Sequence, residues 1–341
     1  MDYFTSTYFD SYTALNEQQI REKLQGHVSM IHVVRLKRSP VAPINLFGYG
    51  DLRRIIDGGS YDVIWTNEPV MGVVTRLAAQ KARKSGSKVL YMVHGFHFYK
   101  GAPLLNWVLF YPVERLMASR ADRIVTVNRE DYQRAKSFSS AEVAYIHGIG
   151  INTERMLQPW KDTMLREELK LGSDDFLVLS VGELNKNKNQ KTVIRAIARL
   201  QDPRVHYVVC GKGDQLDALQ ALAEKNGMIS NVHFLGYRQD IPAVCRQSDL
   251  YVMPSHREGL PVSTLEAMYC GLPVVASAIR GLTDIVENGV NGFLCDPDDE
   301  KAFAEAIRKL HGDPVFRKKF AQQGKTVVEE FCIENTKREI R

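Results

Sequence analysis

The chain has 341 residues, of which 44% are hydrophobic and 25% charged. This ordinary mix excludes intrinsic disorder and low complexity, and the length favours two domains. Residues 1–155 carry 20 Lys and Arg against 14 Asp and Glu, whereas residues 156–341 carry 25 against 26. The basic first half indicates an anionic partner such as a membrane surface, although a biased solvated surface explains the same count. No nucleic acid is expected, because no aromatic-interleaved basic stripe occurs.

In the first half, β-rich runs alternate with helical patterns. Strands are predicted at residues 30–36, 61–66, 88–93 and 123–127, and helices at 45–57, 69–85 and 104–119. No strand followed by a glycine-bearing loop precedes this series. Either the usual opening strand–helix unit of the first domain is missing from this sequence, or that domain is unusually small.

The second half repeats the rhythm. Strands are predicted at residues 176–181, 205–210, 232–235, 250–253 and 273–276, and helices at 189–200, 215–226, 261–269 and 299–310. This alternation predicts a doubly wound α/β architecture. A linker near residues 150–172, helical from 160 to 171, would separate two Rossmann-like domains, 1–155 and 156–325, that face one another across a cleft. Residues 326–341 are expected to form a helix that crosses back to the first domain.

The strongest local pattern spans residues 255–268. A helix opens with Pro261 in its first turn, where proline is favoured, and free N–H groups there suit a diphosphate. Glu266 follows five residues later, roughly 7.5 Å along the axis. Its carboxylate can accept hydrogen bonds from two vicinal ribose hydroxyls there, while Glu258 in the loop would face the sugar. The alternative is a capped surface helix with two unrelated glutamates.

Two glutamates eight positions apart, in the frame Glu-Gly-Leu-Pro…Leu-Glu-Ala-Met, resemble the hallmark of the family 4 retaining glycosyltransferases, which adopt the GT-B fold. Residues 270–276 and 288–293 match the family as well, and the resemblance covers nearly all of residues 30–330. It implies that Glu266 holds the nucleotide ribose and that Glu258 contacts the donor sugar. The expected donor-binding residues are Gly182, Lys186, Lys188, Arg238, Glu258, Gly259, Leu260 and Glu266.

A second site lies at residues 182–189, between a strand and a helix. A glycine turn allows close backbone approach, and a lysine at the helix entrance can neutralise phosphate. The family pattern has an arginine after the glycine and a lysine five residues later. Lys188 matches that lysine, but Glu183 replaces the arginine, and Lys186 is a candidate to compensate. A charged surface turn is the alternative. A uracil contact is expected near the backbone of residues 236–238.

A third site follows the strand at residues 88–93. His94 stands just past the strand end, and the resemblance implies that it contacts the donor sugar. The string of residues 94–101, with Arg38 upstream, is similar to a bacterial subgroup that assembles exopolysaccharide and capsule repeat units on lipid carriers. Arg38, His97 and Lys100 are therefore expected on the acceptor side, although a structural role explains His97 equally well. The aromatic run 107–111 would either face a membrane or pack in the core.

No carboxylate pair supplies a nucleophile and an acid, and no Asp-x-Asp metal motif occurs in a suitable loop. These features agree with a metal-independent, cofactor-free retaining transfer in which the leaving diphosphate accepts the proton of the acceptor. His94, Glu258 and Lys188 would act through positioning and electrostatic stabilisation. The hypothesis is transfer from a nucleoside-diphosphate sugar, a UDP-sugar by the subgroup resemblance, to a lipid-linked sugar acceptor.

Scattered cysteines and no signal-peptide pattern favour a cytoplasmic protein, peripheral on the inner face of the cell membrane. Two rival functions remain. One is a nucleotide-sugar epimerase or phosphorylase on the same architecture, which would need acid–base carboxylates or a dedicated phosphate or pyridoxal site. The other is a catalytically weak nucleotide-sugar-binding partner subunit, which the missing opening unit would favour.

Overall fold

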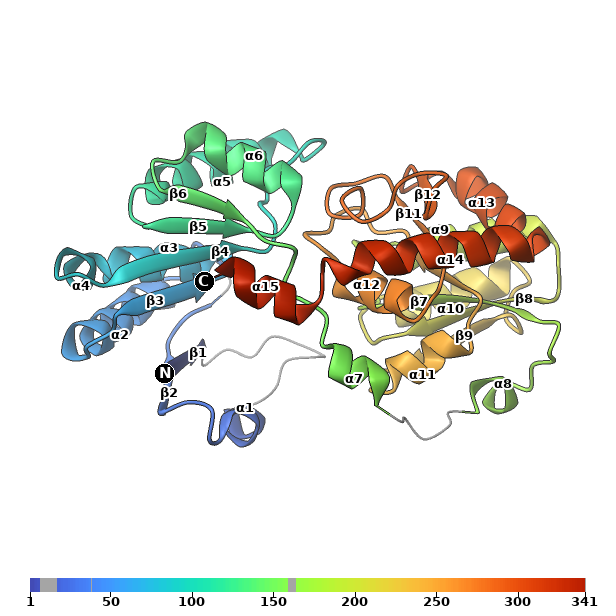
Figure 1. Cartoon of the computed structure of the whole chain (residues 1–341), viewed down its shortest axis with the longest axis horizontal. Helices are drawn as coiled ribbons and strands as arrows, with labels where there is room; N and C mark the ends of the chain where they lie inside the picture. Colours follow the sequence, from blue (N-terminus) through green and yellow to red (C-terminus); the bar gives the residue numbers. More distant parts are fainter. Residues whose placement is uncertain (7–16, 38, 159–163, 341) are drawn as a thin grey trace. The chain divides into compact units, whose positions relative to one another are not determined.

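A computed structural model describes residues 1–6, 17–37, 39–158 and 164–340. They form two compact units, Met1–Tyr145 and Ile146–Arg341, each with parallel strands and covering helices (Figure 1). The division falls at Tyr145 rather than at residue 155. Within the expected linker helix, residues 160–163 lie outside the described residues, and only Leu165–Glu168 is helical among the rest.

The second unit is built on a six-stranded parallel sheet with the strand order β12-β11-β10-β7-β8-β9. In chain order this is the 3-2-1-4-5-6 arrangement of a dinucleotide-binding fold, whose switch point lies between β7 and β10. The strands are β7 (Phe176–Val181), β8 (Val205–Cys210), β9 (Val232–Gly236), β10 (Leu250–Met253), β11 (Val274–Ser277) and β12 (Gly292–Cys295).

Helices cover both faces of this sheet, and β7, β8, β10 and β11 are therefore buried on both sides. This explains why their sequences are continuously apolar. The helices are α7 (Thr153–Leu157), α8 (Leu165–Glu168), α9 (Gln190–Leu200), α10 (Leu216–Lys225), α11 (Ile241–Arg246), α12 (Val262–Tyr269), α13 (Glu300–Gly312), α14 (Pro314–Glu329) and α15 (Ile333–Ile340). The chain end is grouped with the second unit, where the Ile333 N–H donates to the Ile151 carbonyl at 3.1 Å. Its crossing to the first domain stays a prediction.

The first unit contains a four-stranded parallel sheet, β3-β4-β5-β6, and a two-stranded parallel sheet, β1-β2. Its strands are β1 (Asp2–Ser6), β2 (Met30–Val34), β3 (Val63–Asn67), β4 (Lys88–Val93), β5 (Arg123–Thr126) and β6 (Glu142–Tyr145). A strand does precede residue 30, because β1 pairs with β2 along its whole length. No glycine follows β1 before Gly26, which agrees with the absence of a glycine-bearing loop in the sequence pattern. The Tyr61 hydroxyl also donates to the Asp2 carboxylate at 2.7 Å, which ties β1 to the start of β3.

The helices of the first unit are α1 (Glu17–Leu24), α2 (Ile44–Gly58), α3 (Pro69–Ala78), α4 (Gln80–Lys84), α5 (Leu104–Ala118) and α6 (Arg129–Phe138). The helix predicted at residues 69–85 is divided into α3 and α4, because the backbone at Ala79 (φ −78°, ψ −1°) leaves the α-helical range. In Figure 1, α5 and α6 lie along the side of the sheet formed by β5 and β6. No helix in the described part of the chain is both long and apolar enough to cross a membrane.

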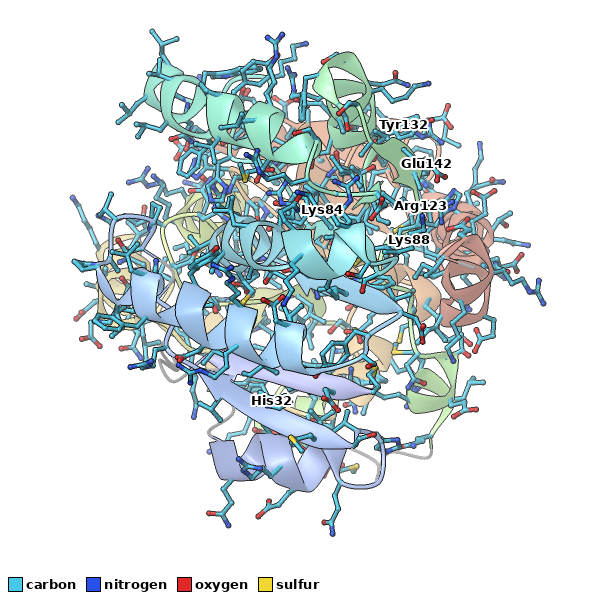
Figure 2. All side chains as sticks on the ribbon, turned by 90° about the vertical axis from the view of Figure 1, so that its left-hand side faces the viewer. His32, Lys84, Lys88, Arg123, Tyr132 and Glu142 are labelled. Atoms are coloured by element: carbon cyan, nitrogen blue, oxygen red, sulfur yellow. The ribbon has the colours of Figure 1, made fainter. Side chains whose placement is uncertain are left out.

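Charged side chains gather at the amino ends of β4, β5 and β6. Lys84, Lys88, Arg123 and Glu142 lie close together on one side of the first unit (Figure 2). Arg123 donates to Glu142 at 2.6 Å, whereas Lys84 and Lys88 extend from exposed positions. The carboxyl ends of the same strands, where His94 follows β4, form the opposite edge of the sheet. Lys88 and Arg123 therefore lie at the edge of the sheet away from His94.

Candidate functional site

The loops that follow β7 and β10 meet at the switch point of the second sheet. The first loop begins at Gly182 and carries Lys188, and the second carries Glu258. The Lys188 Nζ donates to Glu258 Oε1 at 2.8 Å, and the two side chains stay 20% and 12% exposed. The structure thus brings the predicted phosphate-binding cation and the predicted sugar-facing carboxylate together, within reach of a ligand.

Asn187 and Asn189 hold these two loops together through side-chain and backbone hydrogen bonds. The Asn187 Nδ2 donates to the Arg257 carbonyl at 2.9 Å, and the His256 N–H donates to the Asn187 carbonyl at 2.8 Å. Asn189 is buried in a left-handed conformation, φ 55°, and its Nδ2 donates to the Pro254 carbonyl at 3.1 Å. Sequence reasoning missed this role. The signal was available, since asparagine tolerates left-handed backbone better than most residues.

Glycines allow the loops to approach neighbouring backbone closely. A Cβ added to Gly211, which follows β8, would lie 1.8 Å from the Gly182 carbonyl oxygen. A Cβ at Gly281 would lie 2.1 Å from the Gly259 carbonyl oxygen, and Gly281 also has a φ of +78°. Any side chain at either position would push the donor-side loops out of place. The glycine turn at residues 210–214 therefore supports the loop that contains Lys188.

The residues around Lys188 differ in what they contact. Glu183, which stands where the family pattern has arginine, is exposed and accepts a hydrogen bond from Asn185 at 2.9 Å. Lys186 is also exposed, so its ammonium group can approach a bound anion, and its compensating role stays a prediction. Leu260 packs partly buried against the core of the second unit, which fixes the end of the Glu258 loop.

Glu266 lies in α12, which begins at Val262 with Pro261 as its N-cap rather than as its first residue. The Glu266 side chain is 12% exposed, and its Oε1 accepts a hydrogen bond from Arg155 Nη1 at 2.9 Å. Burial raises the pKa of the Glu266 carboxyl above its ordinary value, and the Arg155 guanidinium opposes that rise. The Glu266 carboxylate can therefore accept hydrogen bonds from ligand hydroxyls in place of the one it accepts from Arg155.

Sequence reasoning missed Arg155. This residue lies in α7, where the Asn152 side chain caps the helix by accepting from the Arg155 N–H at 2.9 Å. Its Nη2 is also 3.4 Å from the Gln239 carbonyl, in the loop after β9 where the uracil contact is expected. Arg155 therefore connects the expected ribose carboxylate to the expected base loop. Nothing local in the sequence marks it, because its partners are distant in the chain.

Arg238 was expected to bind the donor. Its guanidinium is committed to carboxylates, with Nε and Nη2 donating to Asp240 at 2.9 and 2.7 Å and Nη1 donating to Glu168 at 3.0 Å. These hydrogen bonds raise the pKa of Arg238 above its ordinary value. The side chain thus stabilises the loop, and a donor contact from this segment is better supplied by its backbone. The neighbouring Tyr237 side chain is 60% exposed, so this loop remains open to solvent.

In the first unit, His94 follows β4 directly. His94 is exposed, yet nearby atoms remove enough water from the ring to lower its pKa below the ordinary value, while the Glu68 carboxylate opposes this. Glu68 itself follows β3 and has φ 65° and ψ 151°, a conformation that residues other than glycine rarely adopt. A neutral imidazole and a strained glutamate therefore lie at the carboxyl edge of this sheet. Sequence reasoning missed Glu68.

The expected acceptor-side residues have different environments. The His97 ring stacks on Phe110 with centroids 4.6 Å apart, which supports its structural interpretation. Lys100 is exposed, and its N–H donates to Glu130 Oε1 at 2.7 Å. Arg38 lies outside the described residues. His94, His97 and Lys100 belong to the first unit, whereas all the expected donor-binding residues belong to the second.

Comparison with known proteins identifies both halves of the chain. Residues 162–327 match the family described as Glycosyl transferases group 1, and residues 10–155 match Glycosyltransferase Family 4. The Bacillus subtilis (strain 168) protein EpsD, which is named as a candidate glycosyltransferase, is 41% identical over 313 residues, covering 90% of this chain and 82% of that protein. An Escherichia coli UDP-Gal:alpha-D-GlcNAc-diphosphoundecaprenol alpha-1,3-galactosyltransferase is 27% identical over 272 residues, covering 77% and 70%.

Among solved structures, Anabaena Alr3699/HepE in complex with UDP and glucose superposes with a TM-score of 0.80 at 23% identity. That match covers 99% of this chain and 90% of the other. At this identity the likeness establishes the fold, which is GT-B with two Rossmann-like domains, as the sequence resemblance implied. Together with the EpsD relationship, these matches show that the chain belongs to glycosyltransferase family 4.

Proposed function

We propose that this glycosyltransferase moves a hexose from a UDP-sugar to a lipid-linked glycan acceptor with retention of anomeric configuration, without a divalent metal. It would work in exopolysaccharide or capsule assembly, as a peripheral protein on the cytoplasmic face of the cell membrane. The observation that carries the proposal is the placement of three charged groups around the switch point. The Lys188–Glu258 pair lies in the loops after β7 and β10, and Glu266 lies in the helix that follows.

The donor would bind along the carboxyl edge of the second sheet. The Glu266 carboxylate would release Arg155 Nη1 in part and accept hydrogen bonds from the two ribose hydroxyls. Lys188 would turn from Glu258 to the diphosphate, where N–H groups at the start of α12 also suit an anion. Glu258, relieved of its lysine, would then accept hydrogen bonds from the sugar. The solved structure that contains UDP and glucose supports a UDP-sugar as the donor.

Catalysis would come from charge placement. As the glycosidic bond to the diphosphate breaks, negative charge grows on the leaving phosphate, and Lys188 stabilises that charge. The acceptor hydroxyl attacks from the same face and passes its proton to the leaving diphosphate. His94, whose lowered pKa keeps it neutral at neutral pH, would donate a hydrogen bond to the donor sugar from the first unit.

The acceptor assignment is supported by the relatives. The name of the Escherichia coli galactosyltransferase, which is 27% identical to this chain, specifies a sugar linked through diphosphate to undecaprenol. A diphosphate-linked polyprenol keeps the acceptor sugar at a membrane surface. Such an acceptor would bring the enzyme to the membrane even though no described helix can cross one.

A transfer assay tests this proposal. Purified protein is incubated with UDP-glucose, UDP-galactose, UDP-N-acetylglucosamine or GDP-mannose and a detergent-dispersed polyprenyl-diphosphate sugar, with and without EDTA. We expect one UDP-sugar to give a product whose new linkage has the donor's α configuration by NMR, at equal rates with and without chelator. Loss of transfer in EDTA with recovery on adding Mn²⁺ would refute metal independence, and a β linkage would refute retention. A product from GDP-mannose alone would refute the UDP assignment.

A further inference from the structure

Helix α5 carries apolar side chains on both its inner and its outer half, although its own unit covers only the inner half. The inner half carries Trp107, Phe110 and Tyr111, which pack into an aromatic cluster with Phe98 and Phe138. The Trp107 ring also lies under the guanidinium of a neighbouring α6 residue at 4.5 Å. The aromatic side chains of the run 107–111 therefore pack in the core, whereas Val108 and Leu109 of the same run are exposed.

The outer half of α5 is exposed. Its six members are spaced one and three or four residues apart, so they share one helical face. We call them the aliphatic face of α5: Leu104, Leu105, Val108, Leu109, Val113 and Leu116. Their exposed fractions range from 42% to 79%. The solvent-facing side of a surface helix is normally polar, so an exposed face of six aliphatic side chains indicates a missing partner.

The charges beside this face are positive. Arg115 is exposed on α5 itself, Lys100 is exposed just before the helix, and Arg120 follows its end. Glu114 is the only acidic residue in α5, and it points inward, where it accepts from Arg76 at 2.8 Å. The anionic headgroups of a bilayer complement this distribution. A two-fold contact with a second copy would instead pair two faces that carry the same positive charges, so it lacks charge complementarity.

The size of the face also favours lipid. Six aliphatic side chains, none fully exposed, amount to roughly a few hundred Å², the size of the largest apolar patches on typical monomers. Stable protein complexes bury about 800 Å² on each partner. The face lies on a single helix, which suits insertion at the boundary between headgroups and acyl chains. At 15 residues, α5 is too short to span the bilayer.

We propose that the aliphatic face of α5 is the surface through which this enzyme docks on an anionic membrane. The six aliphatic side chains insert into the interface, and Lys100, Arg115 and Arg120 lie at lipid phosphates. The reason for this enzyme to dock on a membrane rests on the proposed lipid-linked acceptor. The docking surface itself is identified from the exposure and charge of its side chains. The same loop that carries His94 and Lys100 leads into α5, so docking would present this sheet edge to membrane-bound acceptors.

Vesicle sedimentation of the full-length chain, without substrates, tests the surface. Vesicles of neutral phosphatidylcholine are compared with vesicles that contain about 30% phosphatidylglycerol. We expect binding to the anionic vesicles to be at least about tenfold stronger and to weaken as salt rises. The triple variant Leu105→Ser/Val108→Ser/Leu109→Ser should bind at least about tenfold more weakly. Because these side chains are exposed, its circular dichroism and melting temperature should match those of the parent chain.

Two matched controls separate the surface from general effects. Ile229→Ser/Val315→Ser removes two exposed apolar side chains from the second unit and should leave vesicle binding unchanged. Lys318→Gln/Lys319→Gln removes two exposed charges from α14 of the second unit and should have less effect than Arg115→Gln/Arg120→Gln. Equal effects of the two charge variants would overturn the assignment of the basic residues to this surface.

Three outcomes would overturn docking by α5. The first is binding of the triple variant as tight as that of the parent chain, and the second is no binding of the parent chain to anionic vesicles. The third is a concentration-dependent dimer, seen by analytical ultracentrifugation, that the triple variant abolishes while vesicle binding is absent. The detergent-dispersed transfer assay distinguishes these results from failure of the proposed function. A chain that docks but transfers nothing would refute only the function, and a chain that transfers but does not dock would refute only the surface.

Discussion

The Arg76–Glu114 pair of the first unit and the Lys188–Glu258 pair of the second have the same N–O distance, 2.8 Å, but different access to water. Arg76 is fully buried, and its guanidinium lies 3.9 Å from the centre of the Tyr91 ring. The Tyr91 hydroxyl donates to the second Glu114 oxygen at 2.9 Å. By contrast, Lys188 is 20% exposed in a loop.

This difference separates a structural role from a functional one. A buried charge that loses its partner has no water to replace it, so Arg76 and Glu114 must stay together. Arg76 depends strongly on Glu114, because Arg76 Nη1 has no hydrogen-bond partner among the described residues. Lys188 can exchange Glu258 for a diphosphate, since solvent and ligand reach both groups. The equal N–O distances of the two pairs therefore do not distinguish a structural pair from a functional one, whereas the burial of the side chains does.

The largest expected effect concerns the buried pair. Arg76→Met leaves the Glu114 carboxylate buried without its cation and should lower the free energy of unfolding of the first unit by about 3–5 kcal/mol. Urea unfolding followed by tryptophan fluorescence can measure this, since Trp107 lies in that unit. The double variant Arg76→Met/Glu114→Gln should recover much of the loss, because a neutral amide can still accept from the Tyr91 hydroxyl. A loss below about 1 kcal/mol in Arg76→Met would contradict the structural assignment.

The second prediction concerns the accessible pair. Lys188→Met removes the cation proposed to stabilise the leaving diphosphate, so the transfer rate should fall about 100-fold or more. The free energy of unfolding should change by only about 1 kcal/mol, because both partners keep contact with water. Lys191→Met, on the exposed side of α9, removes the same charge nearby and serves as the matched control. Similar rates for the two variants would place the diphosphate elsewhere.

The third prediction separates the two glutamates. Glu266→Gln keeps the shape of the side chain but removes the charged acceptor for ribose hydroxyls, so UDP affinity should fall about tenfold or more. Glu258→Gln should leave UDP affinity nearly unchanged and mainly reduce turnover, because its proposed partner is the sugar. Titration calorimetry with UDP measures the first effect in both variants. Unchanged UDP affinity in Glu266→Gln would remove this residue from the ribose site.

The smallest expected effect tests Arg155. Its guanidinium lowers the pKa of Glu266 against the influence of burial, so Arg155→Met should raise that pKa further. The ionised carboxylate is the better acceptor, so UDP binding should weaken as pH falls, and this loss should begin at higher pH in Arg155→Met than in the parent chain. Arg155→Lys keeps the charge and should restore the midpoint. Calorimetry across pH 4.5–8 would contradict this role if the three midpoints coincided.

Much of the second unit was predictable because its strands are buried on both faces. The strands at residues 176–181, 205–210 and 250–253 have the predicted limits, since an apolar run bounded by turn residues defines them directly. Strands β1, β6 and β12 were missed. All three lie at the ends of their sheets, and pairing with a neighbouring strand, rather than their own composition, makes them strands.

The sequence by itself determined which charged residues are available at the donor site and their order along the chain. The spacing of Glu258 and Glu266 follows from a strand, a loop and a helix that are consecutive in sequence. Only the tertiary structure decided which charges meet, since Lys188 and Glu258 are 70 residues apart and Arg155 and Glu266 are 111 apart. It also decided which half of α5 is covered. Hydrophobicity is a property of each side chain, whereas burial depends on which neighbours the fold supplies.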